Sequence, residues 1–166
     1  MPSVRLALLA ALLATSAGAQ QPGAAPAASA SRDAALAYVG TGNFIVGRLG
    51  RECLAIVGRT ESPQEFVAQW QQRNALYVDA AAKYMEKRLQ EAAASGGDDK
   101  RAAVQKSMRD AVLGSGEVEV RGMLQNGRRE ESCMRAISLL DAGGLDISPK
   151  TPMYKELEAL VLWARQ

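Results

Sequence analysis

Apolar residues recur at intervals of three and four positions along most of the chain, and this repeat restricts the fold more than any other feature of the sequence. The spacing places apolar side chains on one face of a helix, whereas a half-buried strand would need strict alternation. Helices are expected over 32–57, 62–94, 98–113, 128–142 and 152–164. The sequence therefore predicts an all-α protein, in which residues 31–166 form a single-domain helical bundle of about five to six helices.

The clearest helix start is the stretch Ser62-Pro63-Gln64-Glu65. Serine is a favoured N-cap, proline suits the first helical position, and a glutamate three residues after the serine completes a capping box. We expect this helix to run without interruption to Ala94, which makes it roughly 32 residues and about 48 Å long. Such a helix would be the spine against which the others pack.

The segment at 117–127, EVEVRGMLQNG, is ambiguous. Val118 and Val120 alternate with charged residues as in a strand, whereas the spacing from Val120 to Leu124 suits a helix. We favour a helix because no partner strand is evident. The Gly-Ser-Gly stretch at 114–116 is expected to separate this helix from the one before it.

Residues 1–19 have the pattern of a cleavable signal peptide, with Arg5 near the start, an apolar stretch, and small residues at 17–19. The apolar stretch is about ten residues long, whereas a membrane-spanning helix takes about 20. Residues 20–30, rich in alanine and glutamine with two prolines, are expected to form a flexible, disordered tether. We therefore expect a periplasmic or secreted bacterial protein with no membrane span.

The chain has two cysteines, Cys53 and Cys133. In an exported protein such a pair is expected to form a disulfide, because the compartment is oxidising. The bridge would close a loop of about 80 residues, for which chain entropy alone predicts roughly 4.5 kcal/mol of stabilisation.

The stretch GTGNFIVGRLGREC, at 40–53, is unusually rich in glycine. It does not fit a dinucleotide fingerprint, because the third glycine of G-x-G-x-x-G is replaced by isoleucine. A phosphate-binding loop is also excluded, because no Gly-Lys-Ser/Thr sequence occurs in the chain.

On a helix, Gly40, Asn43, Gly47 and Gly50 would form one stripe with little side-chain bulk. Interior glycines disfavour a helix by about 1 kcal/mol each, so close packing by a neighbouring helix is needed to stabilise it. We expect that neighbour to be the helix beginning at 62, with its aromatic residues against the stripe. A helix break within the run, or a ligand in the groove, are the alternatives.

Trp70, Arg73, Asn74 and Tyr77 are expected near one face of that second helix. This face is expected to form one half of the core. Arg73 and Asn74 would then meet Asn43 as a small buried polar set. Alternatively, these five residues line a groove for a small molecule or a partner, since aromatic faces and a guanidinium group suit rings and carboxylates.

The chain contains no histidine, which excludes histidine-dependent catalysis, the usual zinc sites and CxxCH haem attachment. We expect no enzyme activity, metal or cofactor, although carboxylate-dependent hydrolysis stays open as a less favoured alternative. The formal net charge of +2 gives no general attraction for nucleic acid.

The favoured hypothesis is a noncatalytic exported interaction module that engages a protein or the cell envelope. The alternative is a small-ligand carrier with its groove between the first two helices.

Overall fold

The structure is a computed structural model that describes residues 28–166. Its helices are α1 (Ala30–Cys53), α2 (Pro63–Arg73), α3 (Ala75–Leu124), α4 (Arg129–Asp141) and α5 (Tyr154–Ala164). This part of the chain contains no strand, so the all-α prediction is confirmed. The expected signal peptide and residues 20–27 of the expected tether lie outside the described residues.

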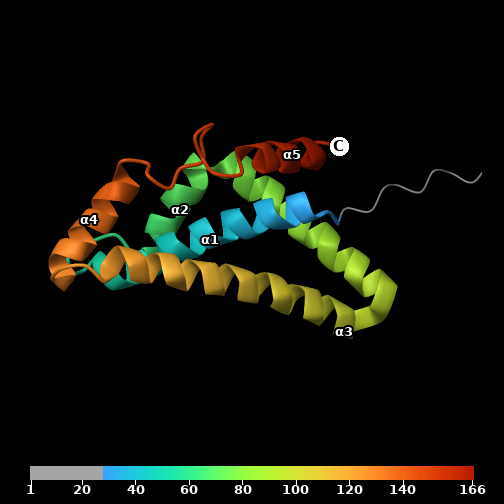
Figure 1. Ribbon diagram of the computed structural model, residues 1–166, viewed down its shortest axis with the longest axis horizontal. Helices are drawn as coiled ribbons and strands as arrows, with labels where there is room; N and C mark the ends of the chain where they lie inside the picture. Colours follow the sequence, from blue (N-terminus) through green and yellow to red (C-terminus); the bar gives the residue numbers. More distant parts are fainter. Residues whose placement is uncertain (1–27) are drawn as a thin grey trace, which may run out of the picture.

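Helix α1 lies at the centre and contacts all four other helices. In Figure 1 it runs through the middle of the molecule, with α2 and α5 on one side and the second half of α3 on the other. Its buried residues recur at helical spacing, and Val46 and Leu49 are almost completely covered. The helix begins after Ser29, whose hydroxyl accepts a hydrogen bond from the backbone N–H of Arg32 at 3.2 Å.

The expected uninterrupted helix over 62–94 is wrong. The capping box at Ser62 is present, but α2 ends at Arg73 and α3 begins at Ala75. Asn74 between them has φ −108° and ψ 19°. Its amide oxygen accepts a hydrogen bond from the N–H of Ile147, and its amide nitrogen donates to the carbonyl oxygen of Trp70 one turn earlier and to Asp146. Tertiary hydrogen bonds therefore stabilise a bend that helix propensity does not reveal.

Helix α3 bends sharply at Gly96 and Gly97, where the backbone is not helical. Gly97 has φ 67° and ψ −162°, a conformation almost restricted to glycine. The second half of α3 consequently folds back along α1, as the yellow-green turn beside the α3 label in Figure 1 shows. The predicted break at this glycine pair is present.

The helix end expected at 114–116 is wrong, because α3 continues to Leu124. Gly116 is buried against the ring of Phe44 in α1, and Val120 is buried one turn further on. These contacts stabilise helix through the Gly-Ser-Gly stretch. The ambiguous segment that follows is helical, as favoured.

Helix α4 begins and ends within one residue of its predicted bounds, and its Cys133 is bonded to Cys53 at the end of α1. The Cα atoms are 5.1 Å apart, and both side chains are buried. The predicted disulfide is therefore present. Helix α1 ends at Cys53, earlier than expected, and turns lead from there to Gly58, whose φ is 73°.

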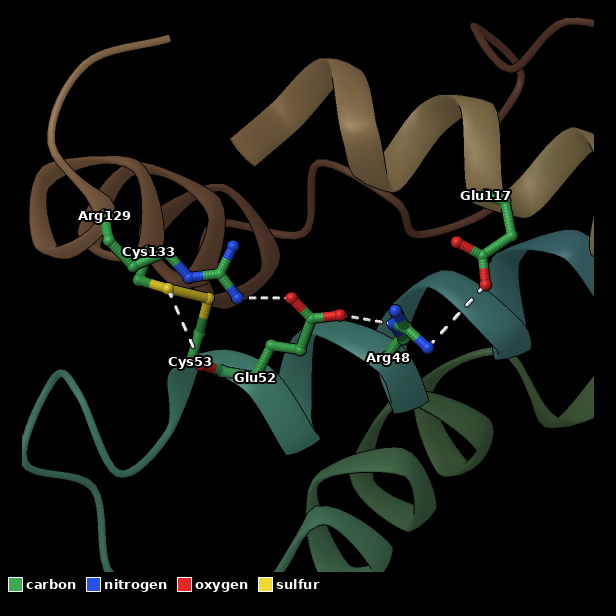
Figure 2. A network of polar contacts seen from close by, with 6 residues as sticks. All are labelled: Arg48, Glu52, Cys53, Glu117, Arg129 and Cys133. Atoms are coloured by element: carbon green, nitrogen blue, oxygen red, sulfur yellow. Dashed lines mark hydrogen bonds and ion pairs between the residues drawn. A yellow bond between two sulfur atoms is a disulfide. The ribbon is translucent and has the colours of Figure 1, made fainter. Parts of the chain in front are cut away.

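An ion-pair network lies beside the disulfide and joins three helices (Figure 2). The carboxylate of Glu52 in α1 binds Arg48 of the same helix and Arg129 of α4. Arg48 also lies 3.7 Å from a carboxylate oxygen of Glu117 in α3. The hydrogen bond from Arg129, together with Arg48, lowers the pKa of Glu52 despite an opposing effect of burial.

The last helix begins at Tyr154, two residues later than predicted. Thr151 and Pro152 belong to a turn, in which the hydroxyl of Thr151 accepts a hydrogen bond from the N–H of Ser148 at 2.9 Å. Met153 then adopts a left-handed conformation with φ 63°. The connection from α4 to α5 is an ordered loop that is hydrogen-bonded to Trp70 of α2 and to Asn74.

Candidate functional site

A cavity of about 450 Å³ lies between α1, the second half of α3 and the loop from α4 to α5. Its wall is mainly apolar, with Ile45 from α1, Met123 from α3, and Leu145 and Ile147 from the loop. Trp70 of α2 also contributes, although it is only 1% exposed. We call this cavity the α1–α3 pocket.

Small residues on α1 create the space for this pocket. Ala34, Ala37 and Gly42 all line it, and their small size leaves room for the cavity beside the larger side chain of Tyr38. A Cβ atom on Gly42 would lie 2.9 Å from Cζ2 of Trp70. The glycine therefore allows the indole ring to approach the α1 backbone at the inner end of the pocket.

The loop wall is held in place by α2 and the residue that follows it. The indole N–H of Trp70 donates a hydrogen bond to the carbonyl oxygen of Leu145 at 3.1 Å. Asn74, only 2% exposed, accepts a hydrogen bond from the backbone N–H of Ile147 at 2.7 Å. Arg73 pairs with Asp146 at 2.9 Å. Each of these contacts fixes one residue of the loop over 145–147.

Of the predicted groove residues, Trp70 and Asn74 agree with the core interpretation and not with an open groove. Trp70 and Asn74 are buried, and Asn74 and Arg73 hold a pocket wall instead of forming a floor. Asn43 does not meet them, because its side-chain oxygen accepts a hydrogen bond from Gln71 at 2.7 Å. The expected buried polar set of Asn43, Arg73 and Asn74 is wrong for this reason.

Tyr77, the fifth groove candidate, faces α5 and not the α1–α3 pocket. Its hydroxyl lies 3.4 Å from that of Tyr154, and the two ring centroids are 6.4 Å apart in an edge-on arrangement. Burial, with a contribution from Tyr154, raises the pKa of Tyr77 to about 12. The bend at Asn74 separates Tyr77 from Trp70, although the continuous helix predicted them on one face.

The glycines of the predicted stripe have two different neighbours. Gly47 and Gly50 face α2, where added Cβ atoms would lie 3.4 Å from Val67 and 3.3 Å from Phe66. Gly40 faces α3 instead, and its added Cβ would lie 2.7 Å from Val112. The glycines of α1 therefore allow close approach of two helices, α2 on one side and α3 on another.

The α1–α3 pocket carries two titratable side chains, Tyr38 of α1 and Glu119 of α3. Burial, followed by the nearby charge of Glu119, raises the pKa of Tyr38. Glu119 itself is exposed, whereas Trp70 is buried, so Glu119 marks the open end of the pocket and Trp70 its inner end.

Sequence reasoning identified Trp70 but missed Tyr38, Glu119 and the loop residues. Their positions in the sequence carry no shared motif, because the pocket combines segments that are far apart along the chain. The predicted groove between the first two helices is filled by close packing, and the cavity opens on the α3 side of α1 instead.

Comparison with protein-family models, with curated proteins and with solved structures finds no match for this chain. None of the helices in residues 28–166 combines the length and the apolar character needed to cross a bilayer. Within the same residues, no group of three or more acidic, cysteine or histidine side chains is placed to hold a metal ion.

Proposed function

We propose that this protein is an exported, noncatalytic carrier that binds a small, largely apolar molecule in the α1–α3 pocket. The pocket itself is the observation that supports the proposal. Its volume of about 450 Å³ falls in the range of roughly 300–1,000 Å³ that is usual for ligand pockets. A mainly apolar wall with a few polar groups at the open end is also typical of such sites.

The chemistry of the wall supports binding over catalysis. Glycoside cleavage, the form of the hydrolase hypothesis that needs no histidine, requires two carboxyl groups facing the substrate. The wall offers one carboxylate, Glu119, and one phenol, Tyr38. Within residues 28–166, neither side chain is hydrogen-bonded to a serine or threonine hydroxyl of the pocket wall.

The test is a titration with N-phenyl-1-naphthylamine, a neutral apolar dye that fluoresces on entering an apolar site. We expect saturable binding at one site per chain. Ala34→Phe should fill part of the pocket and weaken binding at least about tenfold, because an aromatic side chain occupies volume that the dye needs. Ala103→Phe places the same side chain on an exposed position of α3 and should leave binding unchanged.

Thr41→Leu, which also reduces the pocket with a smaller change in volume, provides a second test should Ala34→Phe fail to fold. Denaturation curves of each variant separate loss of binding from loss of folding. Absence of saturable binding to the unmodified protein, or equal binding by the filled variants, would contradict the proposal.

A second candidate, the interaction module expected from the sequence, is supported by a different surface. Leu162 of α5 is 60% exposed and Leu76 of α3 is 50% exposed, and both border one shallow cleft. The outer face of α5 carries Glu158, Ala159 and Arg165 around Leu162. We propose that the partner on this face is a second copy of the same chain.

The charge pattern argues for self-association. Glu158 and Arg165 lie on the same side of the exposed face, before and after Leu162. When two copies of α5 pack antiparallel about a two-fold axis, the glutamate of each copy faces the arginine of the other. Ala159 is small enough to let the helices approach closely.

Sedimentation equilibrium over the micromolar range tests this second proposal. Glu158→Arg should produce a monomer through like-charge repulsion, and adding Arg165→Glu to the same chain should restore the dimer. Leu139→Glu, at an exposed site on α4, is the control and should leave the dimer intact. A monomeric unmodified protein, or a double variant that stays monomeric, would show that α5 is not a dimer face.

A further inference from the structure

We infer that the ligand of the α1–α3 pocket is an amphipathic cation, with an apolar body inside the pocket and an ammonium group at its mouth. The inference rests on the proposed carrier function and specifies the ligand. Glu119 provides the negative charge at the mouth. The wall of the pocket contains no lysine or arginine, so no positively charged side chain within it would pair with an anionic head group.

The two glutamates of this part of α3 have different surroundings. Glu117 lies 3.7 Å from Arg48 of α1 and belongs to the ion-pair network beside the disulfide (Figure 2). Glu119 lines the pocket and is in no salt bridge among the described residues. The structure therefore leaves a carboxylate at the pocket mouth available for a positive charge from outside the chain.

Tyr38 supplies a second polar group at the same end. Its side chain lines the pocket from α1, close enough to Glu119 for the carboxylate to act on its hydroxyl group. A phenol oxygen can accept an N–H hydrogen bond while the carboxylate provides the opposite charge. Together the two groups suit a protonated amine, whereas the negative charge of Glu119 would repel a fatty-acid carboxylate.

The inner part of the pocket suits an aliphatic or aromatic body. Ile45, Met123 and Leu145 provide apolar contacts, and methionine adapts to ligands of different shape. An alkylamine is the simplest molecule that combines such a body with an ammonium group. The same combination of an apolar body and an ammonium group occurs in any small amine that carries an apolar chain or ring.

The experiment compares three probes with the same alkyl chain and different head groups: decylamine, decanol and decanoate. Calorimetric titration at neutral pH and low salt should give the strongest binding for the amine and the weakest for the carboxylate. Glu119 is exposed to solvent, so we expect its charge to favour the amine over the alcohol by about two- to fivefold. Added salt should reduce this preference.

Glu119→Gln should abolish the difference between the amine and the alcohol, because the amide keeps the size of the side chain and removes its charge. Glu117→Gln removes the same charge two residues away, outside the pocket, and should preserve the preference for the amine. Equal binding of the amine and the alcohol by the unmodified protein, or a preference that survives Glu119→Gln, would overturn this inference and leave the carrier proposal intact. Failure of all three probes to bind would contradict the carrier proposal as well.

Discussion

At the residue scale, Gly116 shows how closely α1 and α3 approach. A Cβ atom at this position would lie 2.2 Å from Cδ1 of Phe44. Gly114, two residues earlier in the same helix, has no neighbouring atom within 4 Å of an added Cβ. One glycine is therefore required by packing, and the other only weakens the helix.

This difference gives a matched pair of predictions. Gly116→Ala should lower the free energy of unfolding by about 1–3 kcal/mol, because the added methyl group displaces the phenyl ring. Gly114→Ala should raise it by about 0.5–1 kcal/mol, because alanine is the better helix former. Urea denaturation followed by circular dichroism measures both. Similar effects of the two substitutions would show that Phe44 does not pack against α3.

At the scale of the elements, two bends place the walls of the pocket. The bend at Asn74 directs α3 away from α2, and the bend at Gly96 and Gly97 returns its second half to α1. Without this return, Glu119 and Met123 would not face the pocket. The pocket therefore depends on backbone geometry at residues that do not line it.

Gly97→Ala tests the second bend. An added Cβ would meet no atom within 4 Å, so crowding does not disfavour alanine there. The backbone conformation at this position does disfavour alanine. We therefore expect the free energy of unfolding to fall by about 1–3 kcal/mol. Gly122→Ala, in the helical part of α3 and equally uncrowded, is the control and should be neutral or stabilising. A neutral Gly97→Ala variant would mean that the chain does not adopt this bend in solution.

At the scale of the whole molecule, the disulfide and the ion pairs of Glu52 hold the same end of the bundle together. Cys53 and Cys133 join α1 to α4, and the Glu52 network joins both helices to α3. Helix α1, which carries Glu52 and Cys53, also contacts every other helix. Loss of these connections should therefore reduce the stability of the entire bundle.

The double variant Cys53→Ser/Cys133→Ser should lower the free energy of unfolding by up to about 4.5 kcal/mol, because its unfolded chain is less restricted. Urea denaturation in the absence of reductant measures the change. Reductant should destabilise the unmodified protein to a similar extent and leave the variant unaffected. A variant as stable as the oxidised protein would show that the bridge does not restrict the unfolded chain.

The lowered pKa of Glu52 predicts a dependence of stability on pH. Because the folded state favours the charged carboxylate, the stabilisation is present above the ordinary glutamate pKa of about 4.3 and is lost as the pH falls through the lower folded-state pKa. Glu52→Gln should therefore reduce stability at neutral pH and flatten the decline at acid pH. Glu130→Gln, at an exposed site on α4, should retain the decline. The unfolding temperature of each variant, measured between neutral and acid pH, shows whether its stability still declines at acid pH.

Local sequence signals were enough to predict the helical class, the capping box at Ser62, the pairing of Cys53 with Cys133 and the bounds of α4 to within one residue. Apolar spacing and capping residues are local signals, and a lone pair of cysteines has one possible partner each. These features could therefore be predicted without knowledge of the surroundings.

The end of α2, the length of α3 and the position of the pocket could not be predicted, because they depend on contacts between distant segments. The amide of Asn74 binds a loop more than 70 residues later in the chain, and Phe44 packs on Gly116 across a similar distance in sequence. Such contacts leave no periodic pattern, because each partner is chosen by the packing of the whole bundle. The small residues of α1 indicated close approach, but which helix covers them and which space stays open depend on the two bends of the chain.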